Sequence, residues 1–570
     1  MNTQNTPQLA GHCLVQCLIE QGVTHAFGVP GESFLAVLDG FHAHADRITW
    51  VSNRQEGGAA FMAEAHGKLT GRPGVCFVTR GPGATNASIG VHTAHQDSTP
   101  MVLFVGDVAS DARDREAFQE MDFATFFGPS TLGMAKRVER IDDASRIPEY
   151  VARAFATALQ GRPGPVVLVL PEDMLTQTVV AQPLPRVPNR PQAPDLEAME
   201  AIRSALLSAE RPLVIVGGPA WSATAAQALQ TFAERWHLPV ANAFRFQDTF
   251  DNHHPLYAGD VGLGINPALA ERVRRADVIL ALGPRLGEAT TAGYTLLQAP
   301  VPQQRLLHIH VSAEELGRVY QAEVGVCADM HSAAHALAAL DAPAQPVWRE
   351  WTAQAQRDYQ ANIEVGNGGV QWPSTLDMAK VVHVLQRHLP SDAVLTNGAG
   401  NFASWLHRFY RYHGWVKGAK TQLAPTNGAM GYGVPAGIAA AITTGRPVLT
   451  IAGDGDFLMN GQELATAVQH GAKTVILLVN NGSYGTIRMH QEREYPTRLS
   501  GSDLHNPDFV ALAQAYGYRA ERITHTADFE AAFLRAMAAE SGTVLELVLP
   551  AEVITTRTTL SALQASALRR

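Results

Sequence analysis

Short apolar runs alternate with longer amphipathic stretches along nearly the whole chain. Segments such as RPLVIVGG (211–218), ADVILALG (276–283) and KTVILLVN (473–480) have continuously apolar centres, which is typical of strands buried on both faces of a parallel sheet. The stretches between them are long enough for the helices that connect parallel strands. The sequence therefore predicts an α/β fold built from doubly wound parallel sheets.

Three blocks of this pattern divide the 570 residues, as a length of several ordinary domains allows. We predict a first domain over residues 1–180, a middle domain over 196–341, a third over 370–552 and a C-terminal tail over 553–570. The stretch Val180–Asp195 is rich in proline and has no periodicity, so we expect an extended linker there.

Charge and hydropathy exclude several kinds of partner. The formal net charge is -9 and no block of Lys and Arg occurs, which argues against nucleic acid and anionic membrane as partners. No apolar run approaches the roughly 20 residues of a membrane span, and the N-terminus lacks a basic region followed by an apolar core. We expect a cytoplasmic protein that acts on a small molecule.

The chain has four cysteines. Cys13 and Cys17 are four residues apart, a spacing that also occurs in metal or redox pairs, but both fall on the apolar stripe of an expected helix. Because free cysteine behaves as a small hydrophobic residue, we expect core packing there. Cys76 and Cys327 complete the set, and we predict no disulfide framework.

The segment GDGDF (453–457) follows one apolar run, and the asparagines 480–481 end the next. Asn481 comes 27 positions after Asp454, which leaves room for one helix and one strand and returns the chain to the same sheet edge. Carboxylate and amide oxygens suit Mg²⁺. The glycines let backbone N–H groups approach a phosphate. The segment therefore predicts a site for a metal-bridged diphosphate.

This GDG and NN pair, at this spacing, resembles the signature of the thiamine diphosphate enzymes. The resemblance implies that Mg²⁺ is held by Asp454, Asn481 and the backbone oxygen of Ser483. It also implies that the first domain binds the pyrimidine ring and the third the diphosphate. Further coenzyme contacts are implied at Gly455, Asp456 and Tyr484.

Three other segments resemble parts of the same family. NRQEGGAAFMAEAHG implies that Glu56 bonds to the aminopyrimidine and activates the coenzyme; the alternative is a carboxylate at a helix N-terminus. GAMGYGVPAG implies that Gly428 and Met430 line the coenzyme, with Met430 supporting its bent shape. TNGAGNFASW implies diphosphate contacts at Asn401 and the backbone of Phe402, where the family often has Gln-His.

The resemblance covers nearly the whole chain and is closest to the acetohydroxyacid (acetolactate) synthase group, on the segments FGVPGES, TRGPGATNASIGVHTAHQDSTP and REAFQEMD. It implies that Phe118 and Gln119 lie near the substrate. The implied reaction is decarboxylation of a pyruvate-like 2-oxo acid with carboligation to a second carbonyl. The family forms its site from Glu56 of one subunit and the metal of another, which implies a homodimer or homotetramer with active sites at the subunit interface.

Several positions depart from the synthase pattern and bear on the substrate. His490 stands where synthases have tryptophan, Leu132 where lysine is common, and Arg80 where a small residue precedes GPG. Glu32 stands where synthases have glycine and pyruvate decarboxylases aspartate. It is interpreted either as a proton donor or as a solvated loop carboxylate. The two histidines His92 and His95 are as compatible with packing or capping as with catalysis.

The middle block keeps Arg285 in ADVILALGPRLGEATT but lacks the acidic pair that accompanies the arginine of flavin-binding synthases. The sequence therefore leaves open whether FAD binds. It also leaves open a non-ligating 2-oxo acid decarboxylase or aldehyde lyase, and a flavin-dependent 2-oxo acid oxidase. Glu56 together with both metal ligands argues against a non-catalytic scaffold.

Overall fold

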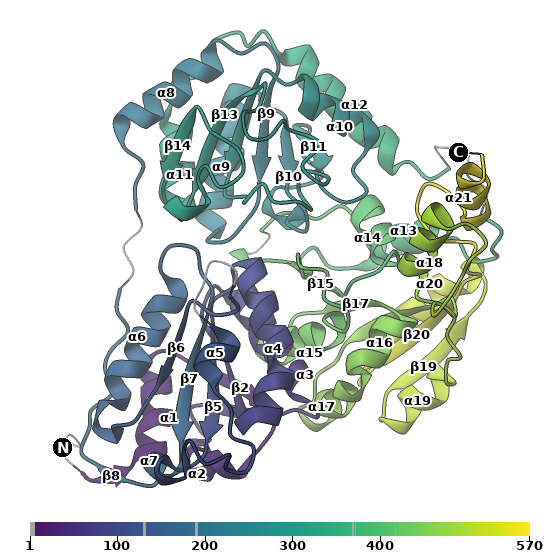
Figure 1. Cartoon of the computed structure of the whole chain (residues 1–570). Coiled ribbons are helices and arrows are strands. Elements are labelled where there is room, and N and C mark those ends of the chain that lie inside the picture. The colour runs from purple at the N-terminus through teal and green to yellow at the C-terminus, as the bar shows by residue number, and fades with distance from the viewer. Residues whose placement is uncertain are drawn as a thin grey trace.

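The computed structural model describes residues 6–128, 133–188, 192–366, 370, 372–415 and 418–569. Figure 1 shows three α/β lobes: the first domain at lower left, the middle domain at the top and the third at lower right. Each has a six-stranded sheet in which all pairs are parallel. The predicted fold class is confirmed.

The first domain has the sheet order β3-β2-β4-β5-β7-β6. Its central strands β4, β5 and β7 carry almost only buried residues because helices cover both faces. Its strands are β2 (His25–Gly28), β3 (Thr49–Ser52), β4 (Gly74–Thr79), β5 (Met101–Asp107), β6 (Arg137–Arg140) and β7 (Pro165–Pro171), with an antiparallel pair β1 (Gln8–Leu9) and β8 (Thr178–Val179) beside them. Its helices are α1 (Ala10–Glu20), α2 (Leu35–Ala43), α3 (Glu56–Thr70), α4 (Arg80–Asp97), α5 (Phe123–Phe127), α6 (Ile147–Leu159) and α7 (Glu172–Leu175).

The third domain has the order β16-β15-β17-β18-β20-β19. Numbered along the chain within each domain, both orders read 2-1-3-4-6-5, so the first and third domains share one topology. Its strands are β15 (Val394–Asn397), β16 (Gln422–Leu423), β17 (Val448–Gly453), β18 (Val475–Asn480), β19 (Arg519–Ile523) and β20 (Thr543–Val548). Its helices are α13 (Met378–His388), α14 (Ala403–Phe409), α15 (Gly433–Thr444), α16 (Asp454–Asn460), the 3-10 turn η7 (Gly461–Glu463), α17 (Leu464–Gln469), α18 (Gly485–Glu494), α19 (Phe509–Ala515) and α20 (Thr526–Met537).

The middle domain has a different order, β11-β10-β9-β12-β13-β14, which reads 3-2-1-4-5-6 along the chain. This is the strand order of dinucleotide-binding sheets. Its strands are β9 (Pro212–Val216), β10 (Val240–Asn242), β11 (Tyr257–Asp260), β12 (Val278–Leu282), β13 (Arg305–His310) and β14 (Val324–Cys327). Its helices are α8 (Leu196–Leu207), α9 (Ala223–Trp236), α10 (Pro267–Arg275), α11 (Met330–Ala339) and α12 (Arg349–Ile363), with a 3-10 turn η4 (Gln247–Thr249).

The predicted domain limits stay predictions, but each sheet lies inside its predicted range. The described part of the predicted linker, between Val179 and Leu196, contains no helix or strand. The predicted tail is partly structured: α21 (Leu560–Ala567) packs on α18 through Leu560 and Met489. All four cysteines are free, three of them buried. Among the described residues, no helix combines the length and the apolar character that a membrane span requires.

The first and third domains pack through a shared core in which α3 contacts α15. A buried charged group lies in this interface: Lys68 pairs with Asp97 and Glu64, and Glu64 accepts a 2.6 Å hydrogen bond from the Tyr432 hydroxyl. Because each buried charge has an opposite charge or donor beside it, the interface fixes α3 against the third domain. The start of α3 carries Glu56.

Candidate active site

Asp454 begins α16 directly after β17 ends at Gly453. Its Oδ1 accepts a hydrogen bond from the Gly455 N–H at 2.9 Å, and its Oδ2 accepts from the Gly482 N–H and the Asn506 amide, each at 2.8 Å. The residue is 3% exposed, and burial raises the pKa of Asp454 although these donors act in the opposite direction. A buried carboxylate thus stands at the carboxyl edge of the sheet.

The predicted asparagine partner lies at the same edge. Strand β18 runs beside β17 with Gly453 opposite Val479, so Asn481 follows the neighbouring strand end. The Asn481 Oδ1 accepts the Ser483 N–H at 3.2 Å, and the Ser483 backbone oxygen accepts the Gly485 N–H at 2.8 Å. The Ser483 hydroxyl is buried and has no hydrogen-bond partner among the described residues. The structure therefore brings the three predicted metal ligands to adjoining strand ends.

Asp456 joins this edge to two glycine-containing loops. Its Oδ1 accepts the Ala399 N–H at 3.2 Å and the Gly431 N–H at 2.8 Å, which fixes the loop that carries Gly428 and Met430. Burial raises the pKa of Asp456 to about 7. Its Oδ2 is buried without a hydrogen-bond partner in the described part of the chain. Such an unpaired buried oxygen indicates a missing ligand or water.

Two glycines at this edge have no side chain and so leave room for aromatic rings to pack against the backbone. A Cβ at Gly453 would lie 2.7 Å from the Phe402 ring, and one at Gly455 would lie 2.5 Å from the Tyr484 ring. The neighbouring Asn401 forms two hydrogen bonds with Thr486 on α18. Its N–H donates to the Thr486 hydroxyl at 3.0 Å, and the same hydroxyl donates to the Asn401 Oδ1 at 3.1 Å. The predicted diphosphate turn is therefore held between α16 and α18.

Glu56 is the first residue of α3 and is half-buried. Its Oε2 accepts a 2.9 Å hydrogen bond from the Asn86 amide on α4. The capping role belongs to the preceding residue, because the Gln55 side chain accepts the Gly58 N–H at 3.0 Å. The Glu56 carboxylate is therefore not needed as the N-cap of its own helix.

The backbone just before Glu56 is anchored by a carboxylate of the third domain. Glu463 is fully buried; its Oε1 accepts the Arg54 and Gln55 N–H groups at 3.1 and 3.0 Å. Its Oε2 accepts the Asn53 amide at 3.0 Å and the Thr466 hydroxyl at 2.7 Å. Burial raises the pKa of Glu463 although these donors oppose the shift. Glu463 thus positions Glu56 from across the domain interface.

Replacing Glu463 with glutamine is expected to destabilise the protein by about 1–3 kcal/mol, because an amide N–H₂ would face two donors in place of one acceptor oxygen. Urea unfolding followed by circular dichroism measures the change. Glu540→Gln, at an exposed position of the same domain, is the control and should unfold like the unsubstituted protein. Equal midpoints for both variants would contradict the anchoring role.

The predicted substrate residues of the first domain surround Arg80, which is buried and has a left-handed backbone with φ of 37°. Its guanidinium lies 2.8 Å from the Glu172 carboxylate and 3.4 Å from that of Glu32. The Glu32 side chain is 58% exposed, so it is an ion-paired and largely solvated carboxylate.

Gln119 has a left-handed backbone with a φ of 66°, and its backbone oxygen accepts the Gly81 N–H at 3.0 Å. Its side-chain Oε1 is buried without a partner among the described residues.

The remaining predicted positions are more scattered. Phe118 is 73% exposed in the first domain, and His490 is exposed on α18 of the third. Burial lowers the pKa of His95 to about 4, with Arg162 and Arg285 acting in the same direction, so its imidazole is neutral and packed. Leu132 lies outside the described residues.

Within one chain, Glu56 and the metal ligands belong to different domains. No hydrogen bond or ion pair between described residues joins Glu56 to Asp454, Asn481 or Ser483. The sequence reasoning also missed three contributors: Asn506, Asn86 and Glu463. Asn506 comes from a loop without a recognisable sequence pattern. Asn86 is the last residue of the GPGATN segment, so that motif could have identified it.

The chain is similar to known proteins over most of its length. Models for the N-terminal TPP binding domain, the central domain and the C-terminal TPP binding domain of thiamine pyrophosphate enzymes match residues 9–126, 199–337 and 398–547. The acetolactate synthase large subunit of Parasynechococcus marenigrum is 33% identical over 541 residues, covering 91% of this chain and 84% of that protein. The chain belongs to the thiamine pyrophosphate enzyme family.

Other relatives of this thiamine pyrophosphate enzyme cover it as fully. The large subunit of acetolactate synthase isozyme 2 of Escherichia coli is 30% identical over 525 residues, 91% of each chain. A probable acetolactate synthase large subunit of Methanocaldococcus jannaschii is 29% identical over 560 residues, 95% of this chain and 92% of that one. Thiamine pyrophosphate and thiamine diphosphate are one coenzyme, so the predicted family is confirmed.

Proposed function

We propose that this enzyme decarboxylates a pyruvate-like 2-oxo acid and joins the remaining acyl unit to a second carbonyl, as an acetolactate synthase does. The observation that carries the proposal is the meeting of Asp454, Asn481 and Ser483 at one sheet edge of a thiamine pyrophosphate enzyme. Relatives that are named acetolactate synthase and that align with nine-tenths of the chain support the reaction type.

The residues at this edge fit Mg²⁺ and a diphosphate. The Asp454 carboxylate, the Asn481 amide oxygen and the Ser483 backbone oxygen are hard ligands of the kind that Mg²⁺ takes beside phosphate oxygens. The buried Asp456 Oδ2 and Ser483 hydroxyl lack partners among the described residues, which leaves polar atoms for the coenzyme or its waters. Asn401, the Phe402 backbone, Gly455 and Tyr484 complete the proposed cradle, with Gly428 and Met430 on the facing loop.

Bound thiamine diphosphate supplies the electron sink that the decarboxylation requires. The side chains of the enzyme bind and orient the coenzyme and the substrate. Glu56, held by Asn86 and by the anchored backbone before it, presents a carboxyl to the aminopyrimidine. Gln119, whose strained backbone and unpaired Oε1 favour a ligand-facing role, is proposed to contact the substrate beside Phe118 and His490. Of the two roles predicted for Glu32, its ion pair with Arg80 and its 58% exposed side chain favour the solvated carboxylate over the proton donor.

We propose a homodimer or homotetramer with the active site shared between subunits. The support is that Glu56 is half-exposed within one chain and that no hydrogen bond or ion pair of the described residues connects it to the metal ligands. A second subunit can supply the missing half when the interface is two-fold symmetric, because each chain then gives Glu56 to one site and Asp454 to the other.

FAD is a candidate structural cofactor of the middle domain. A cavity of about 690 Å³ lies where the carboxyl ends of β9, β13 and β14 meet the first and third domains, lined by Gly218, Ser222, Val311 and Asp329 among others. Coenzymes of dinucleotide type bind at this end of such a sheet. Arg285 is engaged elsewhere, 3.3 Å from the Glu315 carboxylate. A flavin absorption spectrum of the purified enzyme decides the question.

Pure enzyme given thiamine diphosphate, Mg²⁺ and pyruvate is expected to release one carbon dioxide for every two pyruvate consumed and to form acetolactate. Gas release, pyruvate loss and product analysis measure this, with a chelator-treated sample as control. One carbon dioxide per pyruvate, with acetaldehyde as product, would establish a non-ligating decarboxylase instead. Oxygen uptake coupled to pyruvate loss would establish the flavin-dependent oxidase.

A further inference from the structure

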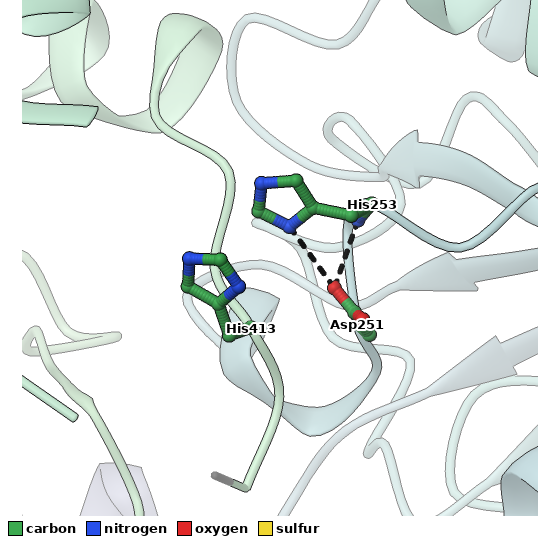
Figure 2. Close-up of side chains that lie close together, drawn as sticks. All are labelled: Asp251, His253 and His413. Atoms are coloured by element: carbon green, nitrogen blue, oxygen red, sulfur yellow. Dashed lines mark hydrogen bonds and ion pairs between the residues drawn. The ribbon is translucent and has the colours of Figure 1, made fainter. Parts of the chain in front are cut away.

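A second group of metal-ligating side chains lies where the middle domain meets the third. Asp251 and His253 follow η4 in the middle domain, and His413 follows α14 in the third. One ligand atom from each residue lies within 4.8 Å of the other two, and all three residues are half-buried. Figure 2 shows the two imidazoles and the carboxylate turned toward one another.

The two loops that carry these residues are fixed by buried hydrogen bonds. The Asn252 N–H donates to the Tyr412 backbone oxygen at 2.8 Å, and the Tyr412 N–H donates to the Asn252 Oδ1 at 3.0 Å. Both residues are 1% exposed. A Cβ at Gly414 would lie 3.3 Å from the Asp251 nitrogen, so the loops also pack closely. The three side chains are therefore held by rigid backbone, as a ligand site requires.

The ligand atoms have lone pairs to offer. The Asp251 Oδ1 accepts from the His253 N–H at 2.9 Å and from its Nδ1 at 3.1 Å. Neither the Asp251 Oδ2 nor a ring nitrogen of His413 forms a hydrogen bond with any residue in the described ranges. The rings stack with centroids 4.2 Å apart at 13°, a geometry in which two imidazolium charges would repel.

We propose that Asp251, His253 and His413 bind one Zn²⁺ that links the middle domain to the third. Two imidazole nitrogens with one carboxylate oxygen suit Zn²⁺, whereas the all-oxygen active site suits Mg²⁺. To bind one ion, the two rings must turn out of their stacked arrangement so that one nitrogen of each faces it, and water fills the fourth position. Coordination by the His253 Nδ1 replaces its hydrogen bond to Asp251, and the neutral ring then carries its proton on Nε2.

The test uses tag-free enzyme saturated with thiamine diphosphate and Mg²⁺ and dialysed against graded ZnCl₂. Unsubstituted enzyme is expected to bind one zinc per chain more than His413→Gln or Asp251→Asn, and zinc should raise its thermal midpoint but not theirs. The matched control is His335→Ala, which breaks a different histidine pair, His331 and His335 on α11 with centroids 4.5 Å apart. This variant should keep the extra zinc.

Three outcomes would overturn the proposal: equal zinc in unsubstituted enzyme and His413→Gln, loss of zinc in His335→Ala, or zinc uptake matched by loss of bound Mg²⁺. Thermal midpoints measured without zinc show whether His413→Gln is folded. If that variant is unfolded, Asp251→Asn decides by the same zinc count.

Discussion

Replacing Asp454 with asparagine is expected to lower kcat/KM for the 2-oxo acid by at least about 100-fold and to weaken coenzyme binding in parallel. Both Asp454 oxygens already accept hydrogen bonds, one from Gly455 and the other from Gly482 and Asn506. An amide removes the charge that would hold the metal ion, and its N–H₂ group faces a donor whichever way it is oriented. The substitution therefore affects the cradle and the metal site together.

Thermal unfolding with and without thiamine diphosphate and Mg²⁺ measures coenzyme binding independently of activity. Thiamine diphosphate and Mg²⁺ together should raise the thermal midpoint of the unsubstituted enzyme, and they should raise that of Asp454→Asn only slightly. Asp528→Asn, an exposed carboxylate on α20 of the same domain, is the control and should behave like the unsubstituted enzyme. If the coenzyme and Mg²⁺ stabilised Asp454→Asn as much as the unsubstituted enzyme, Asp454 would not be a ligand of the metal ion.

The sheet edge that carries Asp454 could be predicted because its determinants are local. Continuous apolar runs identify β17 and β18, and parallel strands leave their carboxyl ends at one edge, so the residues after each run must meet. The structure adds the register, which places Gly453 opposite Val479. The first and third domains have the same strand order, so this edge of the third domain has a counterpart in the first.

Residues that arrive from distant loops could not be predicted in this way. Asn506 bonds to Asp454 across 52 positions and Glu463 to the Arg54 N–H across 409, and no periodicity relates such positions. Glu32 illustrates a different limit. Its identity in the sequence left a proton donor and a solvated carboxylate equally open, and only the ion pair with Arg80 and its exposure show what surrounds it.

Replacing Glu56 with glutamine is expected to lower kcat at least about tenfold, with a smaller effect on coenzyme affinity. Glutamine keeps an oxygen that can accept the Asn86 hydrogen bond but cannot exchange a proton with the aminopyrimidine. Steady-state kinetics at saturating coenzyme measures the loss. Glu149→Gln, a 53% exposed carboxylate on α6, should leave kcat unchanged, and an unaltered rate in Glu56→Gln would refute the assignment.

The same two substitutions decide whether the site is shared between subunits. When Glu56→Gln and Asp454→Asn enzymes are mixed, unfolded and refolded together, a hybrid dimer with a shared site has one doubly substituted site and one intact site. Random pairing makes half of the dimers hybrids, so about a quarter of the original activity should return. A site contained within one chain leaves every site of every dimer substituted. Activity no higher than that of the separate variants would therefore place Glu56 and Asp454 of the same chain in one site.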